Sequence, residues 1–384
     1  MRLCLVYDHL FPQTVGGAER WMRDLALGAA EAGHEVTYLT MRHWNPGAPP
    51  TLPGVRVLGL TDPGRVYTDE RRALGPPLRF GLAVARHLAA RGAGYDVVHT
   101  ASFPYFPLLA AARFRRRAGY RIFVDWHEVW TREYWRSYAG WAVGHVGWRV
   151  QKACVHVPQT AFCMSRLHAR RLLAEGFRGR PIALPGLYSG PVVPAATADV
   201  RPGLVVYAGR HVREKRIDAL VRGFARARER KPSLELELYG DGPDRRGIET
   251  LVRELGLGAS VRMPGKVSED ELERTLGRAA CLATASEREG YGRVIVEAAA
   301  HGTPSVVVRG QENAALELVH EGINGAIAAS AAAWDLADAI LAVVDGGTEL
   351  RESTARWFVE NASTLSLDRS LELVLSSYAR SAVA

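Results

Sequence analysis

The sequence predicts an α/β protein with two domains, each built on a parallel sheet. The chain has 384 residues, too many for one compact core and enough for two domains of just under about 200 residues each. Short apolar runs, typical of buried parallel strands, alternate with amphipathic helical stretches. The same alternation begins again after a proline-rich stretch in the middle of the chain, so both halves are read as βα repeats.

The first half opens with a strand at residues 3–7, followed by the turn Gly16-Gly17-Ala18-Glu19 and a helix that ends near Gly33. Two glycines at a helix start let the backbone approach a phosphate and leave amides free, although any glycine turn looks the same. Ser165 is expected to cap a later helix. Further strands are expected at residues 35–40, 55–60, 96–99, 121–125 and 160–164.

The second half repeats this pattern after a predicted linker from Pro185 to Pro202. Ser268 and Glu271 form a predicted capping box. Gly240-Asp241-Gly242-Pro243 resembles part of a dinucleotide fingerprint, but the third glycine is missing, which speaks against a nicotinamide dehydrogenase. Strands are expected at 204–208, 234–239, 260–263, 280–283 and 305–308, and helices at 217–230, 331–344 and beyond 349.

Composition indicates an ordinary globular protein, with 47% hydrophobic and 23% charged residues. The chain starts directly on a strand-like run rather than a signal peptide, and no apolar run reaches the roughly 18 residues of a membrane span. The four cysteines are scattered without a Cys-x-x-Cys pair, and three lie in apolar runs. We therefore expect reduced core thiols and a cytoplasmic protein.

The net charge of +8 is unevenly distributed. Residues 1–200 hold 25 Lys+Arg and 14 Asp+Glu, whereas residues 201–384 hold 24 and 27. A basic first half suggests an anionic partner, such as a phosphorylated acceptor or a membrane surface, unless it only reflects an Arg-rich composition. The Arg-rich segment 113–117 is open to two interpretations, a solvated helix end or a membrane-facing patch.

The main candidate site is the stretch from Ser286 to Ala298. It follows an expected buried strand and precedes a helix that should stop at Gly302. Glu289 is then expected at the carboxyl end of the strand and Glu297 about two turns into the helix. Ligands of open α/β sheets bind at this edge.

These residues suit a sugar nucleotide. Carboxylates such as Glu289 and Glu297 accept hydrogen bonds from paired hydroxyls, and the amides of Gly290-Tyr291-Gly292 at a helix start favour a diphosphate. The alternative is a solvated acidic loop and an ordinary helical glutamate. The spacing Glu-x7-Glu with Gly-Tyr-Gly inside it is more specific than either acid alone.

Two cations follow the expected strand 204–208. Arg210 and Lys215 bracket a loop that starts at Gly209, and two fixed positive charges can neutralise a leaving diphosphate. Arg-rich loops are common in this chain, so Lys215, one of only four lysines, is the more informative residue.

His127 follows the expected strand 121–125, where its side chain could reach a ligand or serve as a satisfied structural histidine. The same region holds several tryptophans, which fit either a helix face packed on the sheet or an acceptor site for a sugar or lipid. They are Trp126, Trp130, Trp135, Trp141 and Trp148.

In combination these motifs resemble the retaining glycosyltransferases of family four, which have the GT-B fold. The resemblance covers residues 1 to about 325. It rests on the N-terminal Gly-Gly-Ala-Glu, Asp96–His99, Ala208-Gly209-Arg210 with Lys215-Arg216, Tyr239–Pro243, Pro264-Gly265, Ser286 to Ala298 with its Glu-x7-Glu spacing, and Gly302-Thr303-Pro304.

The resemblance implies two Rossmann-like, doubly wound domains facing across a cleft. The acceptor-side domain would span residues 1–195 and the nucleotide-sugar domain 196–364, with a helix at about 365–384 packing back on the first. Arg210 and Lys215 would bind the diphosphate and Glu289 the donor sugar. Glu297 would bind the ribose, Gly16-Gly17 would contact phosphate, and His127 would lie near the reacting carbon.

The expected activity is therefore sugar transfer from a nucleotide sugar, UDP by default, to a hydroxyl acceptor that is lipid-linked, anionic or a small natural product. The chain has no Asp-x-Asp, so neither a metal nor another cofactor is expected, and no nucleic acid partner is indicated. A nucleotide-sugar epimerase or hydrolase, and a nonenzymatic sugar- or membrane-binding module, are the alternatives. Peripheral contact with the cytoplasmic face of a membrane would fit the basic first domain.

Overall fold

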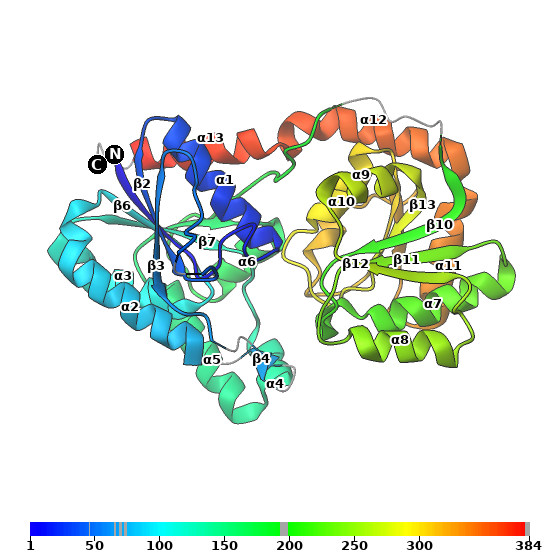
Figure 1. Cartoon of the computed structure of the whole chain (residues 1–384), viewed down its shortest axis with the longest axis horizontal. Coiled ribbons are helices and arrows are strands. Elements are labelled where there is room, and N and C mark those ends of the chain that lie inside the picture. The colour runs from blue at the N-terminus through cyan, green and yellow to red at the C-terminus, as the bar shows by residue number, and fades with distance from the viewer. Residues whose placement is uncertain (46, 65–66, 69–70, 73–74, 193–198, 381–384) are drawn as a thin grey trace. The chain divides into compact units, whose positions relative to one another are not determined.

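The computed structural model describes residues 1–384 except 46, 65–66, 69–70, 73–74, 193–198 and 381–384. The chain divides into two compact units, residues 1–185 with 368–384, and residues 186–367 (Figure 1). The boundary that the sequence predicts between residues 195 and 196 lies outside the described residues.

The first unit is built on a seven-stranded parallel sheet with the order β3-β2-β1-β6-β7-β8-β9. Strands β2 and β3 lie on one side of β1, and the chain then continues on its other side with β6 to β9. The loops that follow β1 and β6 therefore lie at a topological switch point. The strands are β1 (Arg2–Val6), β2 (Glu35–Met41), β3 (Val55–Thr61), β6 (Val97–Ala101), β7 (Arg121–Trp126), β8 (Thr160–Cys163) and β9 (Ile182–Ala183), with a separate antiparallel pair, β4 (Tyr67–Thr68) and β5 (Arg71–Arg72).

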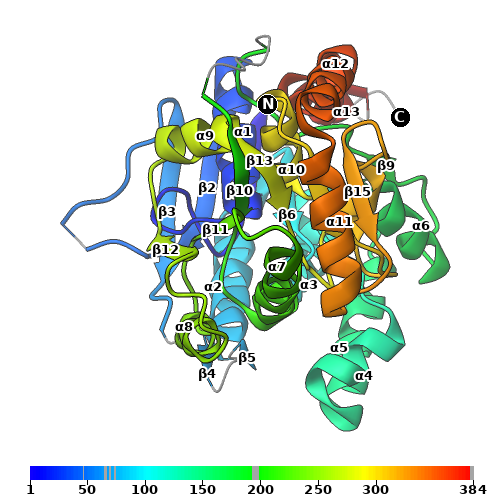
Figure 2. The ribbon, with the colours of Figure 1, turned by 90° about the vertical axis from the view of Figure 1, so that its right-hand side faces the viewer.

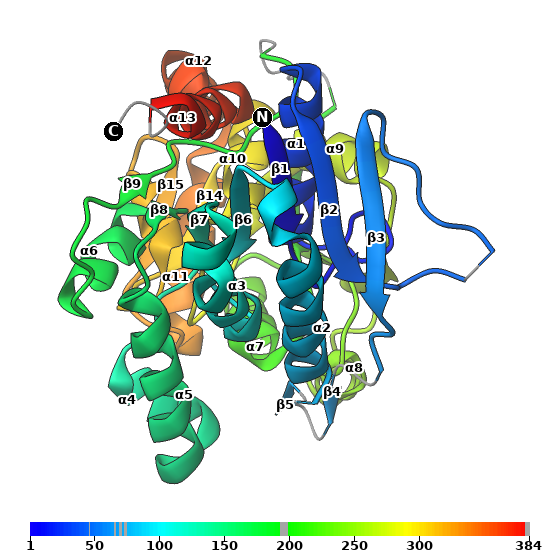
Figure 3. The same ribbon diagram turned by 90° about the vertical axis from the view of Figure 1, so that its left-hand side faces the viewer.

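Helices cover both faces of this sheet (Figure 3). Cys4 and Val6 of β1 point to a core shared with α2, α3 and α5, as alternation along a strand requires. Trp21 of α1 and Tyr378 of α13 pack on the opposite face. The helices are α1 (Gly17–Glu31), α2 (Gly75–Arg91), η1 (Gly92–Gly94), α3 (Tyr105–Ala118), α4 (Arg132–Ala139), α5 (Trp141–Val155), α6 (Arg166–Ala174) and α13 (Leu367–Arg380).

A buried polar chain ties α13 to this unit. The Tyr378 hydroxyl lies 2.5 Å from His99 Nδ1, and His99 Nε2 lies 3.0 Å from Asp125 Oδ1. Trp21 Nε1 donates to the other oxygen of Asp125 at 2.7 Å. All four side chains are fully buried, so each depends on its neighbours to replace water. Burial raises the pKa of Tyr378, which therefore keeps its proton and can donate it to His99.

The second unit has a six-stranded parallel sheet, with β10 and β13 side by side at its centre. Figure 2 shows α7 and α11 together on one face, while α9, α10 and α12 pack on the other. The strands, in sheet order, are β12 (Val261–Gly265), β11 (Glu235–Tyr239), β10 (Arg201–Ala208), β13 (Ala279–Ala283), β14 (Ser305–Val308) and β15 (Gly325–Ala328). The helices are η2 (Arg213–Lys215), α7 (Ile217–Arg230), α8 (Arg245–Glu254), α9 (Glu269–Arg278), α10 (Arg293–Ala300), η3 (Ala314–Glu317), α11 (Ala333–Asp345) and α12 (Gly347–Leu365).

The predicted linker from Pro185 to Pro202 starts where the first compact unit ends, but its last two residues belong to a strand. Strand β10 already starts at Arg201 and includes Pro202. At the other end, Tyr188 pairs with Ser366, and its side chain is buried. A Cβ on Gly186 would lie 1.9 Å from the backbone of Leu365, so only glycine allows this close crossing.

The glycines of Gly240-Asp241-Gly242 serve packing between loops. Gly240 has a φ of +113°, and a Cβ there would lie 1.9 Å from the carbonyl oxygen of Gly209. A Cβ on Gly242 would lie 2.3 Å from the His211 carbonyl oxygen. The loop after β11 therefore crosses directly over the loop after β10, and this crossing explains the partial fingerprint without a dinucleotide.

Both predicted helix caps are confirmed. Ser165 accepts a hydrogen bond from the amide of His168, and Ser268 accepts one from the amide of Glu271. All four cysteines are free and buried, which confirms the expectation of reduced core thiols. Among the described residues, every helix is too short or too polar to pass through a bilayer.

Buried ionisable groups predict a stability maximum near neutral pH. Burial lowers the pKa of six histidines, so the folded chain resists protonation below about pH 6.5, where unfolded histidines take up protons. Burial also raises the pKa of the four cysteine thiols, which unfolded chains ionise above about pH 8.5. The histidines are His34, His43, His87, His127, His211 and His301, and the thiols are Cys4, Cys154, Cys163 and Cys281.

We therefore expect the melting temperature, measured by circular dichroism under reducing conditions, to be highest near neutral pH. It should fall as pH drops below about 6.5 and again as pH rises above about 8.5. A melting temperature that is higher at about pH 5.5 than at about pH 7.5 would contradict the assignment of these histidines as buried and neutral.

Candidate functional site

The predicted cation and acid of the second unit are in direct contact. Lys215 ends the short helix η2 after β10, and Glu289 follows β13, the neighbouring strand. Lys215 Nζ lies 2.5 Å from Glu289 Oε2, and the two side chains are only 20% and 23% exposed. The carboxyl ends of adjacent parallel strands bring together residues that are 74 positions apart in the sequence.

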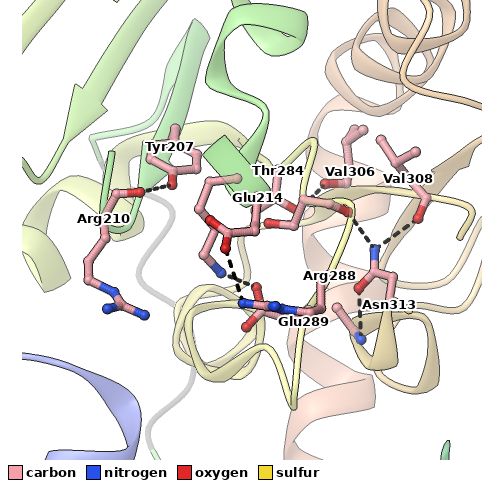
Figure 4. Close-up of polar contacts among 12 residues, drawn as sticks. Tyr207, Arg210, Glu214, Thr284, Arg288, Glu289, Val306, Val308 and Asn313 are labelled. Atoms are coloured by element: carbon pink, nitrogen blue, oxygen red, sulfur yellow. Dashed lines mark hydrogen bonds and ion pairs between the residues drawn. The ribbon is translucent and has the colours of Figure 1, made fainter. Parts of the chain in front are cut away.

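A second ion pair joins the same two loops. Arg288 lies 3.4 Å from Glu214 (Figure 4). The amide of Glu287 also donates to the Glu214 carbonyl at 3.0 Å. Sequence reasoning missed this tie. A signal was present, because Glu214-Lys215 and Arg288-Glu289 are neighbouring charges of opposite sign in matching order.

Asn313 holds the Glu289 segment from the other side. Its side-chain amide is buried and donates to the carbonyls of Ser286 and Val308 at 3.3 and 2.9 Å (Figure 4). The amide of Ala314 donates to the Glu289 carbonyl at 2.9 Å. The backbone of Glu289 is thus fixed between two loops, so its carboxylate is held in place before any ligand arrives. The sequence indicated Asn313 only as the start of a helix, and it caps the short helix η3.

Tyr207 positions the predicted Arg210. Its hydroxyl donates to the Arg210 carbonyl at 3.1 Å, and burial, followed by the nearby Glu289 charge, raises its pKa while Arg210 lowers it. The phenol therefore lies close to both predicted site residues (Figure 4). A Cβ on Gly209 would lie 2.7 Å from this hydroxyl, which explains the glycine. His211 is buried and burial lowers its pKa, so it adds no charge to the loop at neutral pH.

Glu297 lies closer to the start of its helix than expected. Helix α10 begins at Arg293, because Gly292 has a left-handed φ of +99° and forms the N-cap. Glu297 is therefore about one turn into the helix, and the prediction of two turns is wrong. Arg293 Nε donates to Glu297 at 2.9 Å, an i,i+4 pair that the sequence analysis did not note. The hydroxyl of Tyr291, between Gly290 and Gly292, keeps its proton because burial raises its pKa.

The remaining predicted site residues belong to the first unit. Gly16 is the N-cap of α1, and a Cβ there would lie 2.2 Å from a carboxylate oxygen of Glu19. Gly17, in contrast, borders open space. His127 directly follows β7, and its buried Nε2 has no hydrogen-bond partner among the described residues. Burial lowers the pKa of His127, and the negative charges of Asp125 and Glu19 oppose this shift only in part. The ring is therefore neutral at pH 7.

The tryptophans of this unit divide into two groups. Trp126 and Trp135 are buried in the core, where Trp126 Nε1 donates to Gln159 and Trp135 Nε1 donates to Gln151. Trp130 and Trp148 pack partly buried against the same core. Trp141 is different, because 73% of it is exposed at the start of α5. Four of the five tryptophans named from the sequence therefore pack in or against the core, and Trp141 does not.

Two family models match successive parts of the chain. The model described as Glycosyltransferase Family 4 matches residues 15–184, and the model described as Glycosyl transferases group 1 matches residues 194–362. The chain belongs to the glycosyltransferases that these two models describe. The nucleotide-sugar residues proposed above lie within the second matched range, and all first-unit candidates lie within the first.

Curated relatives of this glycosyltransferase act on varied substrates. It is 31% identical over 213 residues to the D-inositol 3-phosphate glycosyltransferase of Actinosynnema mirum, a match to 50% of each protein. It is 27% identical over 331 residues to the MMP alpha-(1->4)-mannosyltransferase of Mycolicibacterium hassiacum, covering 77% of this chain and 78% of the relative. A 34% identical match to the peptide N-acetylglucosaminyltransferase GtfA subunit of Streptococcus parasanguinis spans only 18% of that protein and 24% of this chain. The chain thus matches half or less of two of these three relatives.

Solved structures share the whole architecture. The sucrose-phosphate synthase from Thermosynechococcus elongatus has a TM-score of 0.84 at 19% identity, with both chains fully covered. HepE from Anabaena in complex with UDP and glucose has a TM-score of 0.74 at 15% identity, covering 99% of this chain and 100% of that one. Similarity at this level of identity establishes the fold. The predicted GT-B fold with two Rossmann-like domains is confirmed.

The tie between Arg288 and Glu214 can be tested by a double-mutant cycle with Arg288→Met and Glu214→Gln. Because both side chains are largely buried, we expect a coupling energy of about 1 kcal/mol in the free energy of unfolding. The control is the exposed pair of Arg226 and Glu229, where coupling should stay below about 0.5 kcal/mol. Equal coupling in the two pairs would show that Arg288 does not hold the site loop.

Proposed function

We propose that this chain is a retaining hexosyltransferase that moves a sugar from a nucleoside diphosphate sugar, UDP-sugar by preference, to a hydroxyl acceptor. The contact between Lys215 and Glu289 carries the proposal. A cation suited to phosphate thus lies beside an acid suited to sugar hydroxyls, and Arg210 is on the same loop as Lys215. In a nucleoside diphosphate sugar the diphosphate is bonded directly to the sugar, so one ligand can meet the lysine and the carboxylate at the same time.

In the absence of donor, Lys215 and Glu289 neutralise each other. Donor binding would exchange this contact for two new ones, in which the ammonium meets diphosphate oxygens and the carboxylate accepts hydrogen bonds from the sugar. The segments tied by Arg288 and Asn313 keep both side chains in place, so little reorganisation is needed. A diphosphate would also contact Gly209 and the amides of Gly290-Tyr291-Gly292, and Glu297 would bind the ribose.

The proposed transfer breaks the bond between the anomeric carbon and the diphosphate oxygen, and the electron pair leaves with the nucleoside diphosphate. Arg210 and Lys215 stabilise the negative charge that grows there, which is the role a metal has in other transferases. The acceptor oxygen bonds to the anomeric carbon on the same face, and its proton passes to the leaving phosphate oxygen. No carboxylate nucleophile and no cofactor are required.

The first unit would provide the acceptor side of the reaction. Neutral His127 can donate or accept one hydrogen bond near the reacting carbon, and Gly16 and Gly17 offer amides to a phosphate. We propose an acceptor that is lipid-linked or anionic. UDP is favoured over GDP because the HepE complexes of this fold contain UDP or UDP-glucose, and the GtfA relative is named for UDP-N-acetylglucosamine.

Lys215→Met should lower kcat about 100-fold while the dissociation constant of the donor changes less than about fivefold, because the charge acts mainly on the leaving group. The matched control is Lys266→Met, which removes an exposed lysine of the same unit and should leave both constants unchanged. Steady-state kinetics combined with calorimetric titration separates the two effects. An unchanged kcat for Lys215→Met would remove this lysine from the mechanism.

Glu289→Gln should abolish detectable transfer without weakening the binding of free UDP, since the variant leaves Lys215 free to meet the phosphates. Isothermal titration with UDP and product analysis with UDP-sugars measure the two properties. A parallel loss of UDP affinity would contradict the assignment of Glu289 to the sugar.

A panel of UDP, GDP, ADP and their sugars identifies the donor by thermal shift, because a ligand that binds the folded state raises its melting temperature. We expect the largest shift with a UDP-sugar. Product analysis with that sugar and no acceptor then distinguishes transfer from the alternatives. Rapid epimerisation or hydrolysis of the sugar nucleotide would contradict the proposed transfer. A rise in melting temperature with GDP alone would contradict the proposed UDP donor.

A further inference from the structure

Three helices on one face of the first sheet contain no acidic residue. Helices α2, α3 and α5 have 17, 14 and 15 residues, and the 41 acidic residues of the 384-residue chain would place about five in them at average composition. Helices α1 and α13, on the opposite face, do hold acids, namely Glu19, Asp24, Glu31, Asp368 and Glu372. The basic residues of α2, α3 and α5 are Arg79, Arg86, Arg91, Arg113, Arg115, Arg116, Arg117, Arg149 and Lys152.

These helices form a continuous layer, which we call the basic layer (Figure 3). Gly81 of α2 lies against Phe106 of α3, where a Cβ would come within 2.3 Å of the Phe106 side chain. Tyr105 of α3 donates to Gln151 of α5 at 2.9 Å. The positive charge excess of the first half of the sequence is therefore concentrated on one side of the unit.

The basic layer also exposes large apolar side chains. Trp141, Val143 and Val146 at the start of α5 are 73%, 54% and 61% exposed, and Leu78 and Leu82 at the start of α2 are 47% and 53% exposed. Figures 1 and 3 show the α4–α5 hairpin and the beginning of α2 at the same end of the first unit. Lys152 of α5 pairs with Glu175, and Glu133 lies on the neighbouring α4, but positive charge still prevails. Single exposed apolar residues are common, whereas a tryptophan and four aliphatic side chains on three helices without an acidic residue call for a partner.

We propose that the basic layer docks on an anionic lipid bilayer. Lipid phosphates complement its arginines, and a tryptophan at a helix end is suited to the boundary between headgroups and acyl chains. Val143, Val146 and Leu82 would enter that boundary with it. A nucleic acid would satisfy the charge but leave these apolar side chains in water, so the lipid surface accounts for more of what is exposed. The proposal does not depend on the donor or on the reaction.

Flotation of the full chain with vesicles tests the proposal. We expect binding to phosphatidylcholine vesicles that contain about one third phosphatidylglycerol, little binding to pure phosphatidylcholine, and loss of binding as salt rises toward about 0.5 M. Equal binding to the two vesicle types, or none to either, would overturn it.

Two variants separate the apolar and the charged contributions. Trp141→Ser with Val146→Ser should weaken vesicle binding more than tenfold, and Arg113→Gln with Arg116→Gln and Arg117→Gln should weaken it about fivefold for each arginine. The control is Trp334→Ser, which removes a tryptophan of the second unit that is 57% exposed and should not change binding. All these side chains are at least partly exposed, and melting curves verify folding.

Vesicles that contain brominated lipids test the contact of Trp141 with the bilayer in the parent chain, independently of the flotation experiment. They should quench tryptophan fluorescence, and Trp141→Phe should remove most of that quenching while binding persists. Quenching that survives Trp141→Phe, or variants that bind vesicles as the parent chain does, would overturn the proposal. Tighter binding to single-stranded DNA than to the anionic vesicles would instead assign the basic layer to nucleic acid.

Discussion

The contact between Lys215 and Glu289 is the interaction on which the candidate site depends. It joins the loops after two neighbouring strands, at an edge of the sheet where parallel strands all present their carboxyl ends. Both groups are mostly shielded from water, so each is stable there only while it faces an opposite charge. The proposed nucleotide sugar carries negative charge for Lys215 and hydroxyl groups for Glu289, whereas a simple anion would leave the carboxylate without a partner.

The loops around this contact are held by backbone crossings that demand small residues. Gly240 and Gly242 let the loop after β11 cross the loop after β10, and Gly209 leaves room for the Tyr207 hydroxyl. The side-chain amide of Asn313 donates hydrogen bonds to the carbonyls of Ser286 and Val308, which would otherwise lack a partner. Gly209, Gly240 and Gly242 thus have a packing role, which is to let the loops after β10 and β11 cross at close range.

Local patterns were enough to predict most strands and helices, and the positions of Lys215 and Glu289 after their strands, but not the direct contact between the two side chains. Apolar runs and helix caps act over a few residues, so they can be recognised along the chain without knowing the fold. The contacts of Glu214 with Arg288 and of Asn313 with Ser286 were missed, since they join segments 74 and 27 positions apart whose register only the folded sheet sets. Glu297 was misplaced by a turn because nothing in the sequence marked Gly292 as the N-cap. Likewise, spacing alone did not separate the exposed Trp141 from the buried tryptophans around it.

The buried chain from Tyr378 through His99 and Asp125 to Trp21 has a consequence for synthesis on the ribosome. The second unit is one uninterrupted segment, 186–367, whereas the first needs helix α13 to fill its sheet face. The later segment can therefore reach its final packing while the earlier one still waits for its last helix. Until α13 has been synthesised, His99 lacks its contact with Tyr378, so the domain that is begun first is completed after the second one.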